Sequence, residues 1–449
     1  MTLSLFGTDG VRGRVGVEPI CPDTILKLGW AIGKYLNRSG QSGPVLIGKD
    51  TRLSGYMLES VLEAGLCSAG KDTALLGPLP TPGISYLTRT TDAGAGIVIS
   101  GSHNPHYDNG IKIFSTTGDK INDPSLAEIE QLMMQPPDCV AAELLGKAYR
   151  MDDARKRYID YCKDTIDPET SLENLHVVLD CANGAAYDVA PRVFSGLGID
   201  LTVMNAEPDG YNINQECGST DMRKLQSRVR ESGADLGIAF DGDADRMLMI
   251  DEDGSEVNGD QLLYILAAHR KRKGSAISGV VGTILSNLGL QESLQDVDIP
   301  FARTKVGDRY VREEMITRGW ELGGETSGHI LCLDKSTTGD GIVSALGVLT
   351  AMRETGERLS QLARAMKYYP QCAMNIPIEA GQGSFIEQHP AVRNAVSDAE
   401  SKLGPSGRIV LRASGTEPLF RVMLEGKDSR QLEKLADGVV KAIHRAISR

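Results

Sequence analysis

The sequence predicts an α/β protein built from several domains. Its 449 residues exceed the length that one hydrophobic core supports, so about three domains are expected. Three segments, which begin at Pro44, His176 and Gly279, share a pattern of a β-forming run, a small polar turn and a helical stretch. This pattern is typical of the opening of a parallel βαβ unit, and its repetition along the chain indicates the α/β class.

Each of these segments is followed by a short apolar strand that ends in an unusual loop. The three endings read GIVISGSHNP at 96–105, LGIAFDGDADR at 236–246 and WELGGETSGH at 320–329. Ligand sites of open α/β sheets lie outside the carboxyl ends of the strands. We therefore expect three α/β domains that each bring one loop to a shared site.

Changes in composition indicate where the domains end. The stretch 133–150 is rich in loop-forming residues, and the acidic hairpin IDEDGSEVNGD at 250–260 suggests a second boundary. Beyond MKYYPQ at 366–371, two alternating strands around a glycine turn and a terminal helix predict a smaller α+β domain. The expected domains are 1–150, 151–255, 256–369 and 370–449.

Composition and charge exclude several classes of protein. Hydrophobic residues make up 41% and charged residues 24% of the chain, as in soluble globular proteins. No apolar run approaches the roughly 20 residues of a membrane span. The net charge is −12, with 48 basic and 60 acidic residues and no basic stripe, so no nucleic-acid partner is expected. An anionic ligand must be held by a local cluster of basic groups.

The cysteines and the N-terminus indicate the compartment. The eight cysteines are scattered without a C-x-x-C pair, which is typical of free thiols in a reducing compartment. The N-terminal MTLSLFGTDGVRG has neither a basic leader nor the apolar core of a signal peptide. The cytoplasm is therefore the expected location.

The loop DGDADR predicts a metal site. Asp241, Asp243 and Asp245 follow at two-residue spacing, and apolar strands on both sides press their carboxylates together, so they need a cation. Mg²⁺ or Ca²⁺ would fit. An EF-hand is disfavoured because its sixth position, a required glycine, is Arg246. A solvated acidic turn and a non-enzymatic Ca²⁺-binding module are the alternatives.

Ser102 comes at the end of a buried strand, in the position of a reactive group. No G-x-S-x-G elbow surrounds it, and the adjacent His103 is not expected to face its hydroxyl, so a Ser-His-Asp hydrolase is disfavoured. Lys112 follows on the next strand and can present its amine to the same turn. A serine near a metal loop and a lysine suits phosphoryl transfer, whereas the simpler alternative is an Asn-Pro turn.

Two further loops are candidates for sugar and phosphate binding. GETSGH places Glu325, Ser327 and His329 on one side if the loop is extended, which would let them hydrogen-bond a polyol. RASGTEPLFR resembles a phosphate cradle of guanidiniums, hydroxyls and a glycine turn, and its candidate residues are Arg412, Ser414, Gly415, Thr416 and Arg421. The alternatives are a structural polar turn and surface salt bridges. The glycine-rich start with Arg12 is a weak signal alone.

Together these four loops, in this order, resemble the α-D-phosphohexomutase family over essentially the whole chain. The motifs that carry the resemblance are FGTDGVRG, GKDTRLSGYMLESVLEAGL, PTPGISYLTRT, SHNPHYDNGIK, VGDRYV and TTGDGI. The resemblance implies a four-domain architecture, with three related α/β domains and a smaller C-terminal α+β domain around a central cleft. It also implies interconversion of glucosamine 6-phosphate and glucosamine 1-phosphate, on the route to UDP-N-acetylglucosamine and peptidoglycan.

The resemblance further implies roles for single residues. Ser102 carries a phosphate in the active enzyme, and Mg²⁺ binds this phosphate together with the three aspartates of the metal loop. In the resulting mechanism phosphoserine 102 donates its phosphate to the sugar, the bisphosphate turns around, and the other phosphate returns to the serine. Other roles are expected as follows: Arg12 and Arg246 at the transferring phosphate, Lys112 and His329 as general acid and base, and Lys305, Gly307 and Asp308 at the sugar. The expected partners are the phosphosugar and a bisphosphosugar activator, with a homodimer as an open question.

The sequence departs from the family at a few positions. Gly101 stands where the family usually has alanine, and Ala244 replaces a common glycine in the metal loop, where it restricts the backbone. Neither change removes a ligand. The amino sugar is favoured only through the resemblance, so a phosphomannomutase/phosphoglucomutase remains an alternative. A metal-dependent sugar phosphatase is the alternative from another enzyme class.

Overall fold

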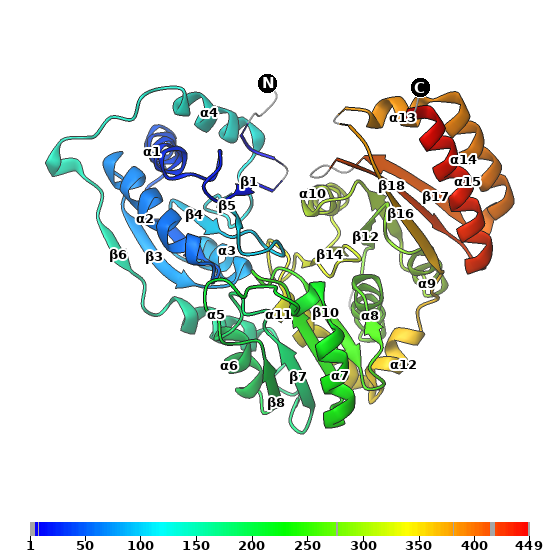
Figure 1. Cartoon of the computed structure of the whole chain (residues 1–449). Helices are drawn as coiled ribbons and strands as arrows, with labels where there is room; N and C mark the ends of the chain where they lie inside the picture. The colour runs from blue at the N-terminus through cyan, green and yellow to red at the C-terminus, as the bar shows by residue number, and fades with distance from the viewer. Residues whose placement is uncertain (1–4, 8, 275–276, 380, 414–417, 448–449) are drawn as a thin grey trace.

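The computed structural model describes residues 5–7, 9–274, 277–379, 381–413 and 418–447. Four sheets in these ranges define four blocks, which Figure 1 shows arranged around a common centre, with the first and the fourth at the two upper corners of the view. The expected α/β class is confirmed. Among the described residues, no helix has both the length and the apolar character that a bilayer crossing requires.

The first block contains a six-stranded sheet in the order β1-β5-β4-β2-β3-β6. Strands β2, β3, β4 and β6 are parallel, and β5 returns antiparallel to β4 and pairs with β1. The strands are β1 (Val11–Arg14), β2 (Val45–Lys49), β3 (Thr73–Pro78), β4 (Ala95–Ile99), β5 (Asp108–Phe114) and β6 (Ala148–Arg150). The helices are α1 (Pro22–Arg38), α2 (Leu53–Ser68), α3 (Thr81–Thr90) and α4 (Asp123–Met133), followed by the 3₁₀ turn η1 (Ala142–Leu144).

The second block has five strands in the order β11-β10-β9-β7-β8. Its strands are β7 (His176–Asp180), β8 (Asp200–Met204), β9 (Leu236–Phe240), β10 (Met247–Asp251) and β11 (Glu256–Val257). Its helices are α5 (Ala154–Asp164), α6 (Val189–Ser195), η2 (Gly218–Thr220) and α7 (Arg223–Ser232). Because β11 pairs with β10, the acidic hairpin stays with the second sheet, just beyond the expected boundary near 255. The four domain ranges remain a proposal.

The third block has four strands in the order β13-β12-β14-β15. Its strands are β12 (Val280–Thr283), β13 (Phe301–Thr304), β14 (Leu322–Gly324) and β15 (Ile330–Cys332). Its helices are α8 (Gly259–Arg272), α9 (Leu288–Asp296), α10 (Asp308–Arg318), α11 (Gly341–Thr355) and α12 (Leu359–Arg364). The sugar-loop candidate connects β14 to β15, and α10 begins directly after β13.

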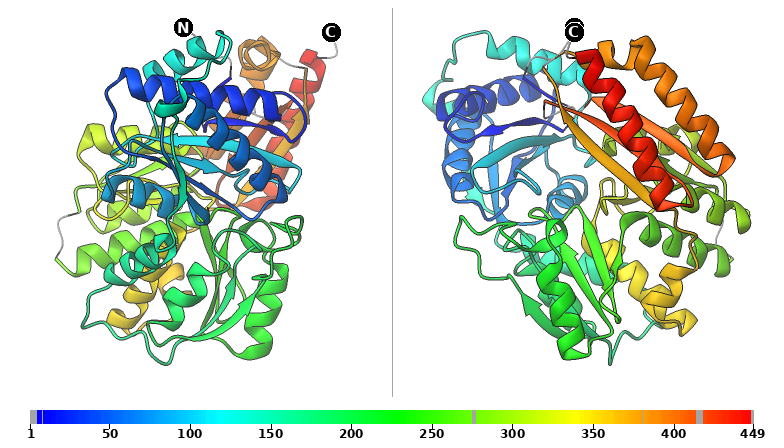
Figure 2. Two further views of the ribbon diagram at one scale, coloured as in Figure 1. Left: turned by 90° about the vertical axis from the view of Figure 1, so that its left-hand side faces the viewer. Right: turned by 45° about the vertical axis from the view of Figure 1, so that its right-hand side comes forward.

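The fourth block is an antiparallel sheet of β16 (Gln371–Pro377), β18 (Leu419–Glu425) and β17 (Arg408–Ala413), in that order. Its helices are α13 (Gly383–Gln388), α14 (Pro390–Leu403), η3 (Gly404–Ser406) and α15 (Ser429–Ile447). Helices α14 and α15 lie together on its outer face (Figures 1 and 2). This is the smaller α+β domain that the sequence predicts.

The hydrophobic core separates the fourth block from the others. One cluster of buried apolar side chains runs from Leu46 to Met366 through parts of the first three blocks. The first block also has a second cluster, from Phe6 to Leu132, and the third a small one around Val281, whereas the described part of the fourth block shares none of these and has a cluster of its own. Polar contacts connect the fourth block to the third: Arg408 Nη1 donates to the carbonyl of Ile284 at 2.9 Å. The first three blocks therefore share a packed core, onto which the fourth docks.

Candidate active site

Ser102 lies in a tight turn directly after β4. The strand is a run of buried apolar residues, and the serine that follows is only 1% exposed. Its φ of 49° is in the left-handed region, which non-glycine residues seldom adopt. Its hydroxyl donates to Asp241 Oδ2 at 2.8 Å, and its backbone N–H donates to Ser100 Oγ at 2.9 Å. The turn thus points the hydroxyl of the first block at the metal loop of the second.

Arg52 and Asn214 hold this turn, and sequence reasoning missed both. The guanidinium of Arg52 is fully buried, pairs with Asp50, and donates to the carbonyls of Ser102 at 3.1 Å and of Asn104. Asn214 Nδ2 donates to the same carbonyls at 2.9 and 3.1 Å. The signal for Arg52 was its place immediately after β2, at the strand edge where the other functional loops begin.

The glycine before the serine lies against this arginine. A Cβ at Gly101 would come within 3.0 Å of both the central carbon and Nη2 of Arg52. The departure from the usual alanine therefore gives the guanidinium more room.

His103 lies closer to the serine than expected from the sequence. Its Nδ1 is 3.4 Å from Ser102 Oγ, so the expectation that it would not face its neighbour's hydroxyl is wrong. Burial, together with the charges of Arg246 and Arg12, lowers the pKa of His103 to about 4. The imidazole is therefore neutral near pH 7, and no carboxylate of the described residues hydrogen-bonds it as in a hydrolase triad.

The three aspartates of the metal loop come together as predicted. They follow β9 directly, all three are buried, and one oxygen of each lies within 4.8 Å of the others. Asp243 Oδ2 accepts from Thr81 Oγ1 at 2.7 Å, whereas Oδ1 of Asp243 and Oδ1 of Asp245 have no hydrogen-bond partner. Buried carboxylate oxygens without a donor are what a hard divalent cation requires. The residues therefore fit such an ion.

The pKa values of two aspartates in the metal loop are shifted in opposite directions. Burial and the neighbouring Asp243 and Asp245 raise the pKa of Asp241. Burial also opposes ionisation of Asp245, but Lys112 and His329 outweigh it and hold its pKa well below the ordinary range. Ala244, between two of the ligands, has a φ of 56°, so the alanine at this position is strained.

Lys112 extends from β5 into the same cluster. Its Nζ lies 3.0 Å from Asp243 Oδ2, 3.2 Å from Asp245 Oδ2 and 3.7 Å from Asp9 Oδ2. Burial would lower its pKa, but these carboxylates raise it well above the ordinary value. Arg12, on the neighbouring strand β1, pairs with Asp9. Asp9 is a further site residue that the sequence did not single out.

Arg246 lies at the end of the metal loop. Its backbone N–H donates to Asp241 Oδ1 at 3.2 Å, and its Nε lies 3.9 Å from Asp245 Oδ1. Burial opposes its charge, but Asp245 and Asp241 dominate and raise its pKa. A permanent positive charge therefore lies beside the serine and the carboxylates.

The sugar-loop candidate is a turn, and the expected extended arrangement of its side chains is wrong. Gly328 has a φ of 88°, and its N–H donates to the carbonyl of Glu325 at 2.9 Å. Ser327 is exposed at the tip, whereas His329 is buried. His329 Nδ1 lies 3.6 Å from Asp245 Oδ1, and its Nε2 lies 3.7 Å from Asp308 Oδ2. Burial opposes the charge of His329, but Asp245 prevails and raises its pKa.

The segment before α10 faces the sugar-loop candidate. Gly307 N–H donates to Glu325 Oε1 at 3.0 Å, and the glycine adopts a φ of 128° that side chains disfavour. Asp308 is the first residue of α10. Lys305 is exposed, with its ammonium 5.7 Å from the ring centre of Tyr310. The structure therefore brings Gly307, Asp308 and Glu325 together.

Only part of the phosphate-loop candidate lies within the described residues. Arg412 on β17 and Arg421 on β18 are directly opposite each other, while Ser414, Gly415 and Thr416 lie outside the described residues. Burial and the charge of Arg421 lower the pKa of Arg412, and Glu325 acts in the opposite direction. Arg412 is therefore close enough to the sugar-loop candidate for their charges to interact.

Comparisons with known proteins agree along the whole chain. Phosphoglucomutase/phosphomannomutase models match it in four pieces: α/β/α domain I over 3–137, domain II over 156–254, domain III over 258–369 and the C-terminal domain over 374–442. A phosphoglucosamine mutase of Marinobacter nauticus is 53% identical over 446 residues, with 98% of both chains covered. One of Pseudomonas putida is 53% identical over 443 residues, with 99% of both covered.

Solved structures with the same fold are more distant in sequence. A phosphoglucomutase/phosphomannomutase family protein from Burkholderia thailandensis has a TM-score of 0.83 at 22% identity, covering 99% of this chain and 98% of its own. An N-acetylphosphoglucosamine mutase of Aspergillus fumigatus, in complex with GlcNAc-6P and magnesium, has a TM-score of 0.70 at 17% identity, covering 99% and 96%. At these identities the likeness establishes a shared fold.

Proposed function

Since the chain belongs to the phosphoglucomutase/phosphomannomutase family, we propose that it interconverts glucosamine 6-phosphate and glucosamine 1-phosphate through phosphoserine 102. The relatives at 53% identity, which carry the name phosphoglucosamine mutase, support the amino sugar as substrate. The observation that carries the chemistry is the buried Ser102 hydroxyl, which donates to Asp241 at 2.8 Å beside two further carboxylates and Lys112.

The proposed reaction has two phosphoryl transfers. In the first, the bond between phosphorus and Ser102 Oγ breaks and a bond from phosphorus to the oxygen of the free sugar hydroxyl forms, which gives glucosamine 1,6-bisphosphate. The proton of that hydroxyl passes to the enzyme. The bisphosphate then turns around. In the second, its other phosphate returns to Ser102 Oγ, and the enzyme returns a proton to the sugar oxygen. Atoms and charge balance over the cycle.

Mg²⁺ is the proposed cofactor. Asp241, Asp243 and Asp245 would hold it together with the phosphate on Ser102. The unpartnered oxygens of Asp243 and Asp245 support this assignment. When bound, a divalent cation offsets negative charge on the transferring phosphoryl group. Arg246 and Arg12 supply positive charge from the chain itself, which is the main electrostatic requirement of phosphoryl transfer.

Lys112 and His329 are the proposed proton carriers. The neighbouring carboxylates raise the pKa of both groups despite their burial, which favours the protonated form of each. A group that donates its proton to the departing oxygen can take one from the attacking hydroxyl in the reverse step. The two residues come from different blocks, so they can serve the two ends of the sugar in turn.

The remaining candidates are proposed to orient the substrate. Glu325, Ser327, Lys305, Gly307 and Asp308 lie on the third block and would contact the sugar. On the fourth block, Arg412 and Arg421, with Ser414, Gly415 and Thr416, would hold the phosphate that does not react. A bisphosphosugar activator would restore phosphate to Ser102. Location in the cytoplasm, which the scattered cysteines support, and a homodimer are further proposals.

A comparison of substrates tests this function. Purified, phosphorylated protein with Mg²⁺ should convert glucosamine 6-phosphate with a kcat/KM well above those for mannose and glucose phosphates. A higher kcat/KM for glucose or mannose phosphates would instead assign the phosphoglucomutase/phosphomannomutase activity. Net release of inorganic phosphate from any of these substrates would indicate a sugar phosphatase.

A further inference from the structure

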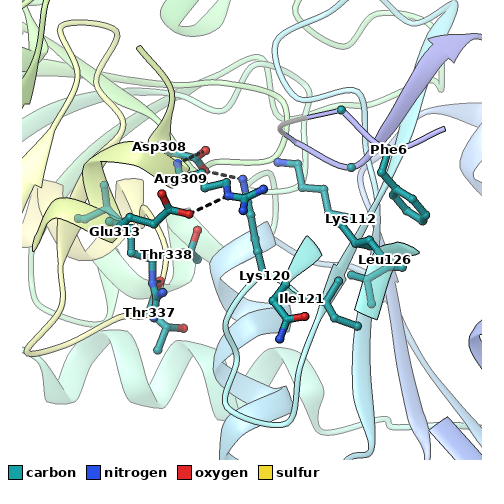
Figure 3. A pocket seen from close by; sticks show the side chains of 16 residues that line it. Phe6, Lys112, Lys120, Ile121, Leu126, Asp308, Arg309, Glu313, Thr337 and Thr338 are labelled. Carbon is teal, nitrogen blue, oxygen red and sulfur yellow. Dashed lines mark hydrogen bonds and ion pairs between the residues drawn. The ribbon is translucent and has the colours of Figure 1, made fainter. Parts of the chain in front are cut away.

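Lys120 lies between the first and third blocks, at a pocket of about 200 Å³ beside the site. It follows β5 at the end of a short turn, and its Nζ lies 2.5 Å from Asp308 Oδ2 at the start of α10. The same ammonium pairs with Asp9. Figure 3 shows Lys120 reaching across the pocket toward Asp308, with Lys112 on its own side. No expectation from the sequence included this lysine.

Lys120 completes a closed ring of alternating charges. Asp308 lies 3.7 Å from His329, His329 lies 3.6 Å from Asp245, Asp245 lies 3.2 Å from Lys112, and Lys112 lies 3.7 Å from Asp9. Lys120 joins Asp9 to Asp308 and so closes the ring. The ring takes groups from three blocks, and it contains both proposed proton carriers.

The charge of Lys120 keeps two carboxylates in place. Asp308 and Asp9 repel each other across the ring, and each pairs with the ammonium between them. Without that ammonium, Asp9 would be drawn toward Lys112 and Arg12, and Asp308 would lose its fixed position beside His329. The two proton carriers would then lose part of their orientation, although both would keep their contacts with Asp245.

We propose that Lys120 is a positioning residue for proton transfer, which fixes Asp308 against His329 and Asp9 against Lys112. The inference rests on the proposed function. It assigns Lys120 no contact with the substrate, so its loss should lower the rate of the chemical step more than substrate binding.

A second ion pair also joins the first block to the third and supplies a matched control. Arg309, which follows Asp308 in α10, forms a bidentate ion pair with Asp123, with N–O distances of 2.6 and 2.9 Å. Its side chain also pairs with Glu313 but contacts no member of the ring. Arg309→Gln therefore removes a contact between the blocks and leaves the ring intact.

The test compares Lys120→Met, Lys120→Gln, Lys120→Arg and Arg309→Gln in full-length phosphorylated protein with Mg²⁺. Both neutral Lys120 variants should lose about ten- to a hundredfold in kcat, with a clearly smaller rise in KM, since Asp308 is also among the proposed sugar contacts. Single-turnover transfer from labelled phosphoserine should slow by the same factor. Lys120→Arg should recover most of the loss, and Arg309→Gln should keep the wild-type kcat while its unfolding midpoint falls.

Other results would overturn the inference. If the neutral Lys120 variants match Arg309→Gln in kcat, or do not fold at all, Lys120 only joins the two blocks. If KM rises tenfold at unchanged kcat, Lys120 binds substrate. A wild-type protein that converts no sugar phosphate would overturn the proposed function and this inference together, which separates that failure from the first two.

Discussion

Lys112 partly neutralises the carboxylates of the metal loop, as a bound divalent cation would. Removing this lysine should therefore strengthen Mg²⁺ binding, although it removes a residue of the site. The three carboxylates of the metal loop have oxygens within 4.8 Å of one another. With all three ionised, each pair repels by roughly 3.5 kcal/mol at an effective dielectric constant of about 20, or about 10 kcal/mol in all.

The lysine offsets this repulsion almost fully. Its Nζ lies 3.0 and 3.2 Å from Asp243 and Asp245. At the same dielectric constant each contact returns about 5 kcal/mol. The two sums nearly cancel, so the ammonium stabilises the cluster when no ion is bound, and it opposes an arriving cation by like-charge repulsion.

Lys112→Met should therefore abolish turnover and yet bind Mg²⁺ at least about tenfold more tightly, a gain of about 1.4 kcal/mol. At Mg²⁺ about 100 times the wild-type Kd, the ion should stabilise the wild type by about 2.7 kcal/mol and the variant by about 4 kcal/mol. Urea unfolding with and without Mg²⁺ measures both values.

A buried lysine elsewhere provides the control. Lys49 pairs with Glu59, and both side chains are almost inaccessible to solvent. Lys49→Met removes an equally buried ammonium whose ion-pair partner is Glu59 and not a carboxylate of the metal loop, so its Mg²⁺ response should equal that of the wild type. If Lys112→Met responds to Mg²⁺ no more than the wild type does, the Lys112 ammonium does not oppose the cation.

Three further predictions concern other parts of the molecule. Arg412→Ala removes a charge-assisted contact worth about 1.5–3 kcal/mol, so kcat/KM should fall roughly ten- to a hundredfold; a change below about twofold would place the phosphate clamp elsewhere. Burial raises the pKa of Asp340 to about 6, above its unfolded value, so the stabilisation it gives is full at low pH and is lost as pH rises through that pKa. Relative to the wild type, Asp340→Asn should gain up to about 3 kcal/mol in unfolding free energy between about pH 4 and pH 7; an unchanged difference contradicts the shift. Ala244→Gly relieves a positive φ of 56° and should stabilise the protein by up to about 1 kcal/mol in urea unfolding, with activity retained.

The sequence predicts well what lies within one loop and poorly what lies between loops. The alternating aspartates of DGDADR predicted their own cluster, because ligands at two-residue spacing after a buried strand must meet. The apolar strand before Ser102 likewise predicted its position. By contrast, Thr81, Arg52 and Asp9 act on loops far away in the chain, and nothing in their local spacing shows which block they will face.

The same reason explains the errors at the sugar-loop candidate. Alternation along an extended segment predicted one face for its polar residues, but a hydrogen bond from Gly328 to Glu325 closes the segment into a turn. The turn exposes Ser327 and buries His329 against groups from two other segments. Backbone hydrogen bonding decided the geometry there, and the side-chain pattern carried no sign of it.

The transfer of labelled phosphate from Ser102 shows whether this serine relays phosphate between the two ends of the sugar. Protein labelled with radioactive phosphate on Ser102 is mixed with glucosamine 6-phosphate and Mg²⁺, and the products are separated over time. The label should leave the protein, appear first in the bisphosphate and then at carbon 1 of the product, while inorganic phosphate stays unlabelled. Label that remains on Ser102 through many turnovers, or that leaves mainly as inorganic phosphate, would contradict a phosphoserine relay.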